Sequence, residues 1–295
     1  MPSRRPVCIV TDSAARLPLS WTSQYPLVIL PHLVSFDAEH WLREDVDLNE
    51  HELACWLRQT PTPFTVRAPS VEQFIETYQA LDKQHVDVLS LHVSAALSEA
   101  IANAQQARAR FLGSCNIHIF DSGTAALGLH MMVRDALRLL ESGCTLDEVV
   151  TKLRFLRQTA YGYFVSDELL WLKRSGRLRP SQAVISMMMG IIPCLTFEQG
   201  DLVAVEKVRH MEQAIEKVAE FAVEFDSNAY CVLTQLCPTA NRLPQLTKLA
   251  NALNAFSPAF KRDMPVWSCG VTLGRLLGPR GFGFMAYEGD VAKVA

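Results

Sequence analysis

The chain has 295 residues, with 28 Lys plus Arg and 31 Asp plus Glu, which gives a formal net charge of −3. Its 49% hydrophobic and 20% charged residues are typical of a folded globular protein and exclude a disordered chain. The slight acidic excess provides no overall attraction to nucleic acid, so we expect no nucleic-acid partner.

Short apolar segments alternate with helical patterns through the first half of the chain. The sequence predicts strands at 7–10, 27–34 (interrupted by Pro31), 86–93 and 117–120. It predicts helices at 48–59, 71–81, 98–111, 125–140 and 146–158, and Thr145 and Glu148 have the spacing of a capping box for the last one. Residues 61–70 form an extended, proline-rich connection that contains Thr65 and Ser70. This alternation predicts a mostly parallel sheet covered by helices.

The pattern changes near residue 160. The second half predicts strands at 161–165, 192–197, 202–208, 229–235, 266–268 and 282–287, with a hairpin turn at 198–201. It predicts helices at 167–174, 183–189, 211–225 and 243–253. We therefore expect an α/β fold of two domains: an N-terminal α/β domain, residues 1–160, and a C-terminal α+β domain with a hairpin, residues 161–295.

No segment has the properties of a signal peptide or a membrane span. The longest apolar stretch, 183–197, has 15 residues and includes Pro193, whereas a bilayer span needs about 20. This stretch contains Met187, Met188 and Met189. These side chains either belong to the ordinary hydrophobic core or line a tunnel for an acyl chain. None of the eight cysteines has CxxC spacing, so we interpret them as reduced, mostly buried thiols of a cytoplasmic protein.

Three first-half strands end in hydroxyl or carboxylate residues: Thr11-Asp12-Ser13, Ser94 and Asp121-Ser122. Ligands of open α/β sheets bind beyond the carboxyl ends of the strands, where helix N-termini attract anions. Each of these residues can equally serve only as a helix cap. The sequence contains no GxSxG, HExxH or GxxxxGK[ST] motif, and His85, His92, His118 and His130 lack metal-ligand spacing, so we expect no cofactor or metal.

The order of several short motifs resembles the DegV family of bacterial fatty-acid-binding proteins. The matching segments are 10–13 (VTDS), 68–70 (APS), 93–98 (VSAALS), 120–122 (FDS), 169–178 (LLWLKRSGRL), 191–193 (IIP), Gly200, 207–209 (KVR) and 278–279 (GP). Each motif is weak alone, whereas their order over nearly the whole chain is fairly specific.

The resemblance implies a lipid-binding protein of bacterial phospholipid metabolism, not itself an enzyme, with a long-chain fatty acid in an apolar tunnel between two domains. Hydroxyl residues would hold the carboxylate: Ser94 is the clearest ligand, and Thr11, Asp12, Ser13 and Ser122 would border the head group. Some family members deliver the fatty acid to a separate ATP-dependent kinase. Arg177 and Arg209 match family arginines near the ligand mouth or the partner surface, or are solvated surface charges.

The sequence departs from the family pattern at several positions. Val66 stands where the family has a carboxylate-binding Thr, and Thr65 can replace it only if a local bulge turns its side chain around. Arg67 is an alternative, because it can pair with the carboxylate through two hydrogen bonds. Leu276 stands where the family has a His, and Glu99 where it has a Gly.

These departures keep a second hypothesis open. The chain can be a diverged enzyme that acts on another small acidic molecule. Its acid and base groups would then be among Asp12, Ser13, Asp121 and Glu99.

Overall fold

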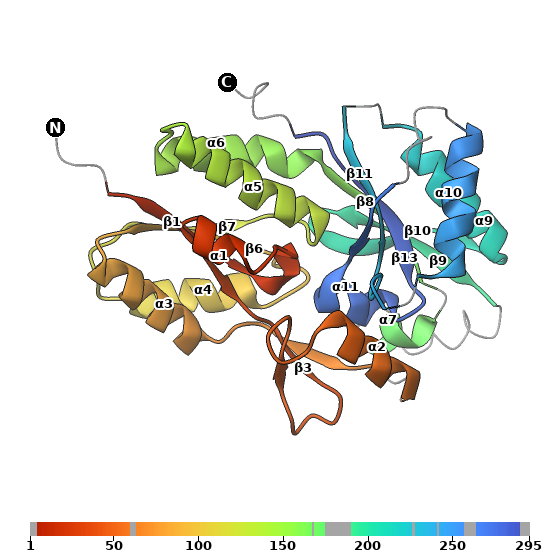
Figure 1. The fold of residues 1–295 in the computed structure, drawn as a ribbon, viewed down its shortest axis with the longest axis horizontal. Coiled ribbons are helices and arrows are strands. Elements are labelled where there is room, and N and C mark those ends of the chain that lie inside the picture. The colour runs from red at the N-terminus through yellow and green to blue at the C-terminus, as the bar shows by residue number, and fades with distance from the viewer. Residues whose placement is uncertain are drawn as a thin grey trace.

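The computed structural model describes residues 5–59, 63–166, 168–174, 190–225, 228–240, 242–256 and 264–289 (Figure 1). Its first part is a four-stranded parallel sheet in the order β2–β1–β6–β7. The strands are β1 (Val7–Asp12), β2 (Leu27–Leu30), β6 (Asp87–His92) and β7 (Ile117–Asp121). They are short and apolar because parallel sheets are buried on both faces.

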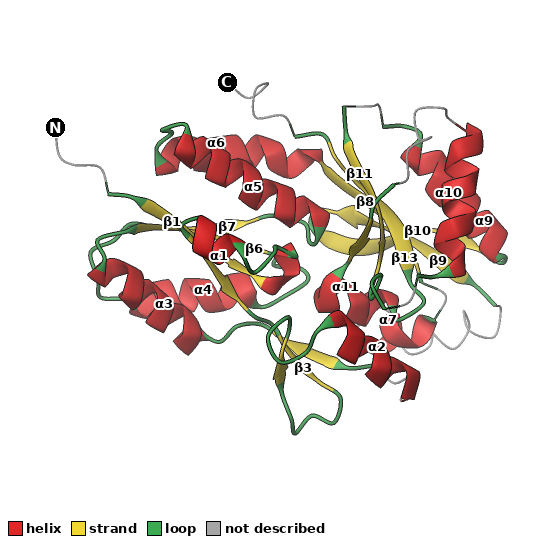
Figure 2. Cartoon of the chain, in the orientation of Figure 1, coloured by secondary structure: helices red, strands yellow, loops and turns green. Residues whose placement is uncertain are grey.

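Helices cover both faces of this sheet (Figure 2). On one face lie α3 (Val71–Lys83) and α4 (Ala100–Arg110), and on the other α5 (Leu127–Glu141) and α6 (Leu146–Leu156). Strand side chains alternate accordingly: Val10 packs in the cluster of Phe74 and Ala104, and its neighbour Ile9 in that of Leu129. Capping boxes begin α3 at Ser70 and, as predicted, α6 at Thr145.

The second sheet has six strands in the order β10–β9–β8–β13–β11–β12. They are β8 (Ala160–Val165), β9 (Ile192–Glu198), β10 (Asp201–Val208), β11 (Tyr230–Gln235), β12 (Val266–Ser268) and β13 (Phe282–Tyr287). All neighbours pair antiparallel except β11 and β12. Helices α9 (Met211–Ala222) and α10 (Pro244–Phe256) cover one face, and α5 packs against β13 from the first part of the chain.

A third, small sheet lies beside the first two and has the order β4–β3–β5. Its strands are β3 (Leu33–Ser35), β4 (Leu42–Arg43) and β5 (Thr65–Arg67). Around it are α2 (Glu50–Gln59), α7 (Leu169–Arg174) and α11 (Gly270–Leu277). The remaining short elements are η1 (Ser13–Ala15), α1 (Trp21–Gln24) and η2 (Arg157–Thr159).

The predicted α/β class, the parallel first sheet and the hairpin at 198–201 are confirmed. The structure differs from the sequence-based expectations or adds to them in three places. Residues 27–34 form two strands of different sheets, because the chain turns at Pro31; residues 65–67 form a strand of the small sheet; and α11 was not expected. The expected helix 183–189, with its three methionines, lies outside the described residues. The division at residue 160 stays a prediction.

Five of the eight cysteines are buried, namely Cys8, Cys115, Cys194, Cys237 and Cys269. Burial raises the pKa of the Cys8 thiol to about 11, so this thiol stays protonated and behaves as an apolar side chain. Within the described ranges, no helix combines the length and hydropathy needed to cross a bilayer.

Candidate functional site

The carboxyl ends of β1, β6 and β7 meet at one edge of the first sheet, as predicted. Asp12 accepts a hydrogen bond from the Val93 backbone N–H (3.1 Å), and Asp121 accepts one from Ala95 N–H (3.3 Å). The three polar strand ends therefore share one loop cluster. Most of their polar groups, however, bind one another or the backbone.

Asp12 heads a fully buried chain of hydrogen bonds. Its Oδ2 lies 2.9 Å from His92 Nδ1, His92 Nε2 lies 2.6 Å from Ser90 Oγ, and Ser90 Oγ lies 2.7 Å from the Tyr78 hydroxyl. Burial alone would raise the pKa of the Asp12 carboxyl. The net shift is nevertheless downward, because the carboxylate is stabilised by the hydrogen bond and charge of His92, by the charge of His32 and by the hydrogen bond from Val93 N–H. This order of groups is that of an activated serine, but Ser90 has no solvent exposure and offers no nucleophile to a substrate.

Ser94, Ser122 and Thr11 are also buried. Ser94 Oγ donates to the carbonyl of Gly200 in the β9–β10 turn (2.6 Å). Ser122 closes a local turn with Thr124. Thr11 Oγ1 has no hydrogen-bond partner among the described residues. The strand-end hydroxyls thus connect loops to one another.

A polar cavity of about 380 Å³ opens beside this loop cluster. Three of its polar lining residues lie in the motifs singled out from the sequence or next to them: Ser98 in the motif 93–98, Glu99 directly after it, and Arg67 directly before the motif 68–70. His32, Thr272 and Arg275 were missed. The other lining residues are Val66, Ala68, Ala95, Ala96 and Leu97.

Two buried polar atoms that belong to lining residues have no partner in the described part of the chain. Arg275 uses Nη2 to donate to the Leu97 carbonyl (2.6 Å), but its buried Nε has no acceptor. The hydroxyl of Thr272, one turn earlier on α11, is buried and also unmatched. Arg67, in contrast, is exposed and lies over the Trp41 ring, with 3.7 Å between its guanidinium carbon and the ring centroid. Unmatched buried donors favour an acceptor ligand.

The charges around the cavity also favour an anion. Burial lowers the pKa of His32, more than the carboxylates of Asp12 and Glu44 raise it, so the imidazole is neutral at pH 7. Burial lowers the pKa of Arg275 and Glu99 opposes this, but an arginine stays charged. The guanidinium groups of Arg67 and Arg275 and the carboxylate of Glu99 together give the lining of the cavity a net charge of +1.

The structure places the other candidate residues away from this cavity. Thr65 is exposed, and β5 pairs with β3 in continuous register, without the bulge that would turn Thr65 toward Val66. Arg209 is exposed after β10, and Leu276 is fully buried in the core. Arg177 lies outside the described residues. The ligand roles assigned to these side chains stay predictions.

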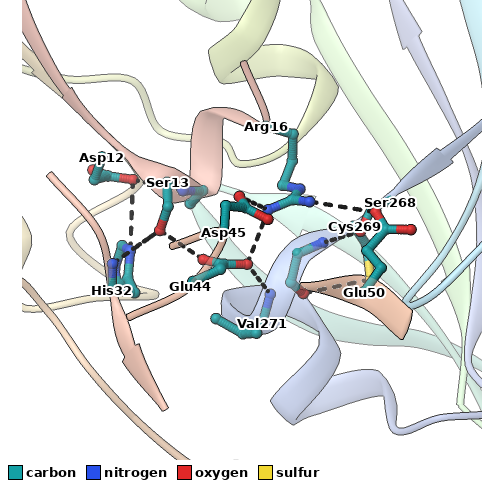
Figure 3. Close-up of polar contacts among 12 residues, drawn as sticks. Asp12, Ser13, Arg16, His32, Glu44, Asp45, Glu50, Ser268, Cys269 and Val271 are labelled. Atoms are coloured by element: carbon teal, nitrogen blue, oxygen red, sulfur yellow. Dashed lines mark hydrogen bonds and ion pairs between the residues drawn. The ribbon is translucent and has the colours of Figure 1, made fainter. Parts of the chain in front are cut away.

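Ser13, His32 and Glu44 form a buried network behind the cavity (Figure 3). Ser13 Oγ donates to Glu44 Oε2 (2.6 Å) and lies 3.2 Å from His32 Nδ1, while His32 Nε2 lies 3.0 Å from Ser98 Oγ. No sequence signal identified His32 or Glu44, because neither belongs to a motif and their partners are far away along the chain.

A second cavity, of about 300 Å³, is mainly apolar and meets the residues that follow α11. Its lining residues are Ala54, Leu57, Arg58, Glu168, Gln235, Leu236, Cys237, Leu243, Pro279 and Arg280. No cluster of His, Cys, Asp or Glu in the described ranges is arranged to hold a metal ion.

Comparisons with known proteins agree on one family. A family model described as "Uncharacterised protein, DegV family" matches residues 6–289. A DegV domain-containing protein of Halalkalibacterium halodurans is 29% identical over 283 residues, which are 95% of this chain and 98% of the relative.

Solved structures show the same fold. A fatty acid binding DegV family protein from Streptococcus agalactiae has a TM-score of 0.83 at 22% identity, covering 97% of this chain and 100% of that one. A DegV family protein from Thermus thermophilus, whose structure is described by its fatty acid binding, has a TM-score of 0.77 at 26% identity, covering 96% and 99%.

Proposed function

The chain belongs to the DegV family, and on this basis we propose that it binds a fatty acid, with the carboxylate in the polar cavity. It acts as a carrier and not as a catalyst. This proposal is supported by the likeness to solved fatty-acid-binding members and by the chemistry of the cavity wall.

The observation that carries the proposal is the pair of unmatched donors on α11. Arg275 and Thr272 both line the cavity, and each has a buried polar atom, the Nε–H and the hydroxyl, without a partner among the described residues. A carboxylate has two oxygens that can accept both, and the bond from the guanidinium is charge-assisted. Arg67, an exposed lining residue of the same cavity, supplies a second cation. The hydroxyl that the family places at Val66 is thereby replaced by guanidinium groups.

The acyl chain needs an apolar path from this head-group site. Val66 and Leu97 are buried apolar side chains of the cavity wall, and both belong to the largest hydrophobic cluster. The apolar cavity lies past the end of α11, at Pro279 and Arg280. We place the acyl chain along α11, from the polar cavity toward the apolar one.

Delivery of the fatty acid to an ATP-dependent kinase in the cytoplasm is part of the proposal and rests on the family resemblance alone. Exposed Arg209 is a candidate contact for such a partner. The test is formation of acyl phosphate, trapped as the hydroxamate, when the loaded protein is mixed with a purified kinase and ATP. Wild-type protein would support this reaction, and Arg209→Ala would slow it without loss of bound lipid.

The experiment that tests the binding proposal is mass spectrometry of the small molecules released on denaturing the purified protein. We expect a stoichiometric fatty acid, or stoichiometric uptake of one when oleate is added. A protein that stays empty and shows no saturable uptake of oleate or palmitate would refute it.

A further inference from the structure

Glu44 does not line the polar cavity, but it contacts helix α11, which supplies two lining residues, and Ser13, which bonds a third, His32. Its carboxylate is buried and comes from the end of the short strand β4. Oε1 accepts from the Val271 backbone N–H (2.9 Å), and Oε2 accepts from Ser13 Oγ (2.6 Å) (Figure 3). These two contacts lead to the two sides of the head-group site.

The first contact fixes the helix that carries the anion donors. Val271 is the second residue of α11, where backbone N–H groups lack partners within the helix and the helix dipole favours a negative charge. Gly270, with φ of +70°, permits this close approach, because a Cβ there would lie 3.3 Å from Glu44 Oε1. Thr272 and Arg275 follow on the same helix and line the cavity.

The second contact fixes the opposite wall through a chain of hydrogen bonds. Because Ser13 Oγ donates to Glu44, it accepts from His32 Nδ1–H (3.2 Å), and His32 Nε2 then accepts from Ser98 Oγ–H (3.0 Å). Ser98 adjoins Leu97, whose carbonyl accepts from Arg275 Nη2.

The two contacts therefore converge on Arg275. One holds the helix that carries its backbone, and the other holds the loop that binds its Nη2. Together they fix the position of Arg275, whose buried Nε–H has no acceptor among the described residues.

Arg16 keeps the Glu44 carboxylate in place. Its Nη1 lies 3.1 Å from Glu44 Oε1 and also bonds Asp45, and its Nη2 lies 3.3 Å from Glu50. Burial lowers the pKa of the Arg16 guanidinium, but the carboxylates of Glu44, Asp45 and Glu50 raise it by more. The net shift is upward, so the guanidinium is always charged.

We propose that Glu44 is a positioning residue of the anion site: it does not touch the ligand, and it sets the geometry of Arg275 relative to the Leu97–Ser98 loop. This inference rests on the proposed function, because it assumes that the cavity holds a carboxylate. A glutamine at this position has one acceptor and one donor end and cannot accept from Ser13, Val271 and Arg16 together.

The test compares the affinities for oleate and for its methyl ester, which shares the chain but lacks the charge. We expect Glu44→Gln to lower the acid-to-ester affinity ratio by about tenfold, the effect of misaligning one charge-assisted hydrogen bond. A merely structural role would weaken both ligands equally and leave the ratio unchanged, and that result would overturn the inference.

Asp45→Asn is the matched control, because Asp45 also pairs with Arg16 but has no contact with Ser13 or Val271 among the described residues. Its φ of +62° suits asparagine. The control should keep the wild-type ratio, and an equal fall in both variants would assign the effect to Arg16 and overturn the inference.

A second variant covers the case in which Glu44→Gln does not fold. Ser13→Ala removes the hydroxyl that bonds Glu44, His32 Nδ1 and the His32 backbone N–H, and it leaves the contact of Glu44 with Val271 in place. It should lower the acid-to-ester ratio in the same direction; an unchanged ratio would overturn the inference. Wild-type protein that binds neither ligand, or binds both equally, would instead refute the proposed function.

Discussion

Replacing Arg275 by Met tests the head-group site most directly. Methionine keeps the apolar stem that packs on α11 and removes the guanidinium group. The change eliminates the Nη2 bond to the Leu97 carbonyl and the buried Nε–H, which has no acceptor among the described residues. It leaves Thr272, Arg67 and the buried network of Glu44 chemically intact.

The expected magnitude follows from these two groups. The intramolecular hydrogen bond from Arg275 Nη2 to the Leu97 carbonyl is worth about 1 kcal/mol. Its loss would lower the stability of the folded protein and would affect the binding of all ligands alike. The lost bond to a carboxylate is charge-assisted and worth about 1.5–3 kcal/mol. Since 1.4 kcal/mol is about tenfold, oleate should bind about 10- to 100-fold more weakly. The variant should bind the methyl ester with nearly the same affinity as the wild-type protein does.

The assay is displacement of a fluorescent fatty acid by oleate and by methyl oleate at fixed pH and ionic strength. Arg58→Met is the matched control. Arg58 lines the apolar cavity, so its replacement removes an equal charge at a position away from the head-group site. If Arg275→Met keeps the wild-type ratio of the two affinities, or if Arg58→Met lowers it as much, the anion site has been assigned to the wrong cavity.

Three further variants have definite expectations. Val66→Thr places a hydroxyl on the cavity wall, so oleate should bind about tenfold more tightly in the same displacement assay; equal gains for the ester would contradict a carboxylate contact. Asp12→Asn should lower the free energy of unfolding in urea by about 3 kcal/mol at pH 7. Because the folded pKa of Asp12 lies below its ordinary value of 3.8, its contribution is present above that value and is lost as the pH falls below it; a deficit equally large at pH 3 would be inconsistent with this. Gly200→Ala should destabilise more than Gly143→Ala in thermal unfolding. Both glycines have positive φ, but only at Gly200 does a Cβ lie 2.5 Å from Ser94 Oγ, so equal losses would rule out the clash.

The fold was largely predictable because its first half repeats one local rule. An apolar segment followed by an amphipathic helix predicts a parallel strand and its cover, and β1, β6 and β7 follow it. The small sheet was not predictable in this way. Strands β3 and β5 pair through residues about thirty positions apart, and β4 has only two residues, so neither gives a periodic signal. Gly270 and Gly274 similarly obscured α11, which has only eight residues and is buried except at Arg275.

The place of the candidate site was predictable, but most of the residues that line its cavity were not. The rule that ligands lie beyond the carboxyl ends of parallel strands led to the edge of the sheet beside which the polar cavity opens. It could not distinguish hydroxyls that bind a ligand from those that bind a neighbouring loop, and Ser94 donates to Gly200 in the structure. Glu44 and Val271 are 227 positions apart, so their contact exists only in the folded chain.

The loss of the family histidine at Leu276 need not remove polar function from α11. Successive helical residues are rotated by about 100°, so Leu276 faces the core while Thr272 and Arg275, three positions apart, share the face toward the cavity. If the proposed head-group site is correct, the adjacent Arg275 supplies a cation on the helix where the family resemblance implies an imidazole. A guanidinium stays charged at every physiological pH, whereas an imidazole does not. Affinity for a carboxylate in this chain should therefore depend less on pH, above the pKa of the ligand, than it would with a histidine on this helix.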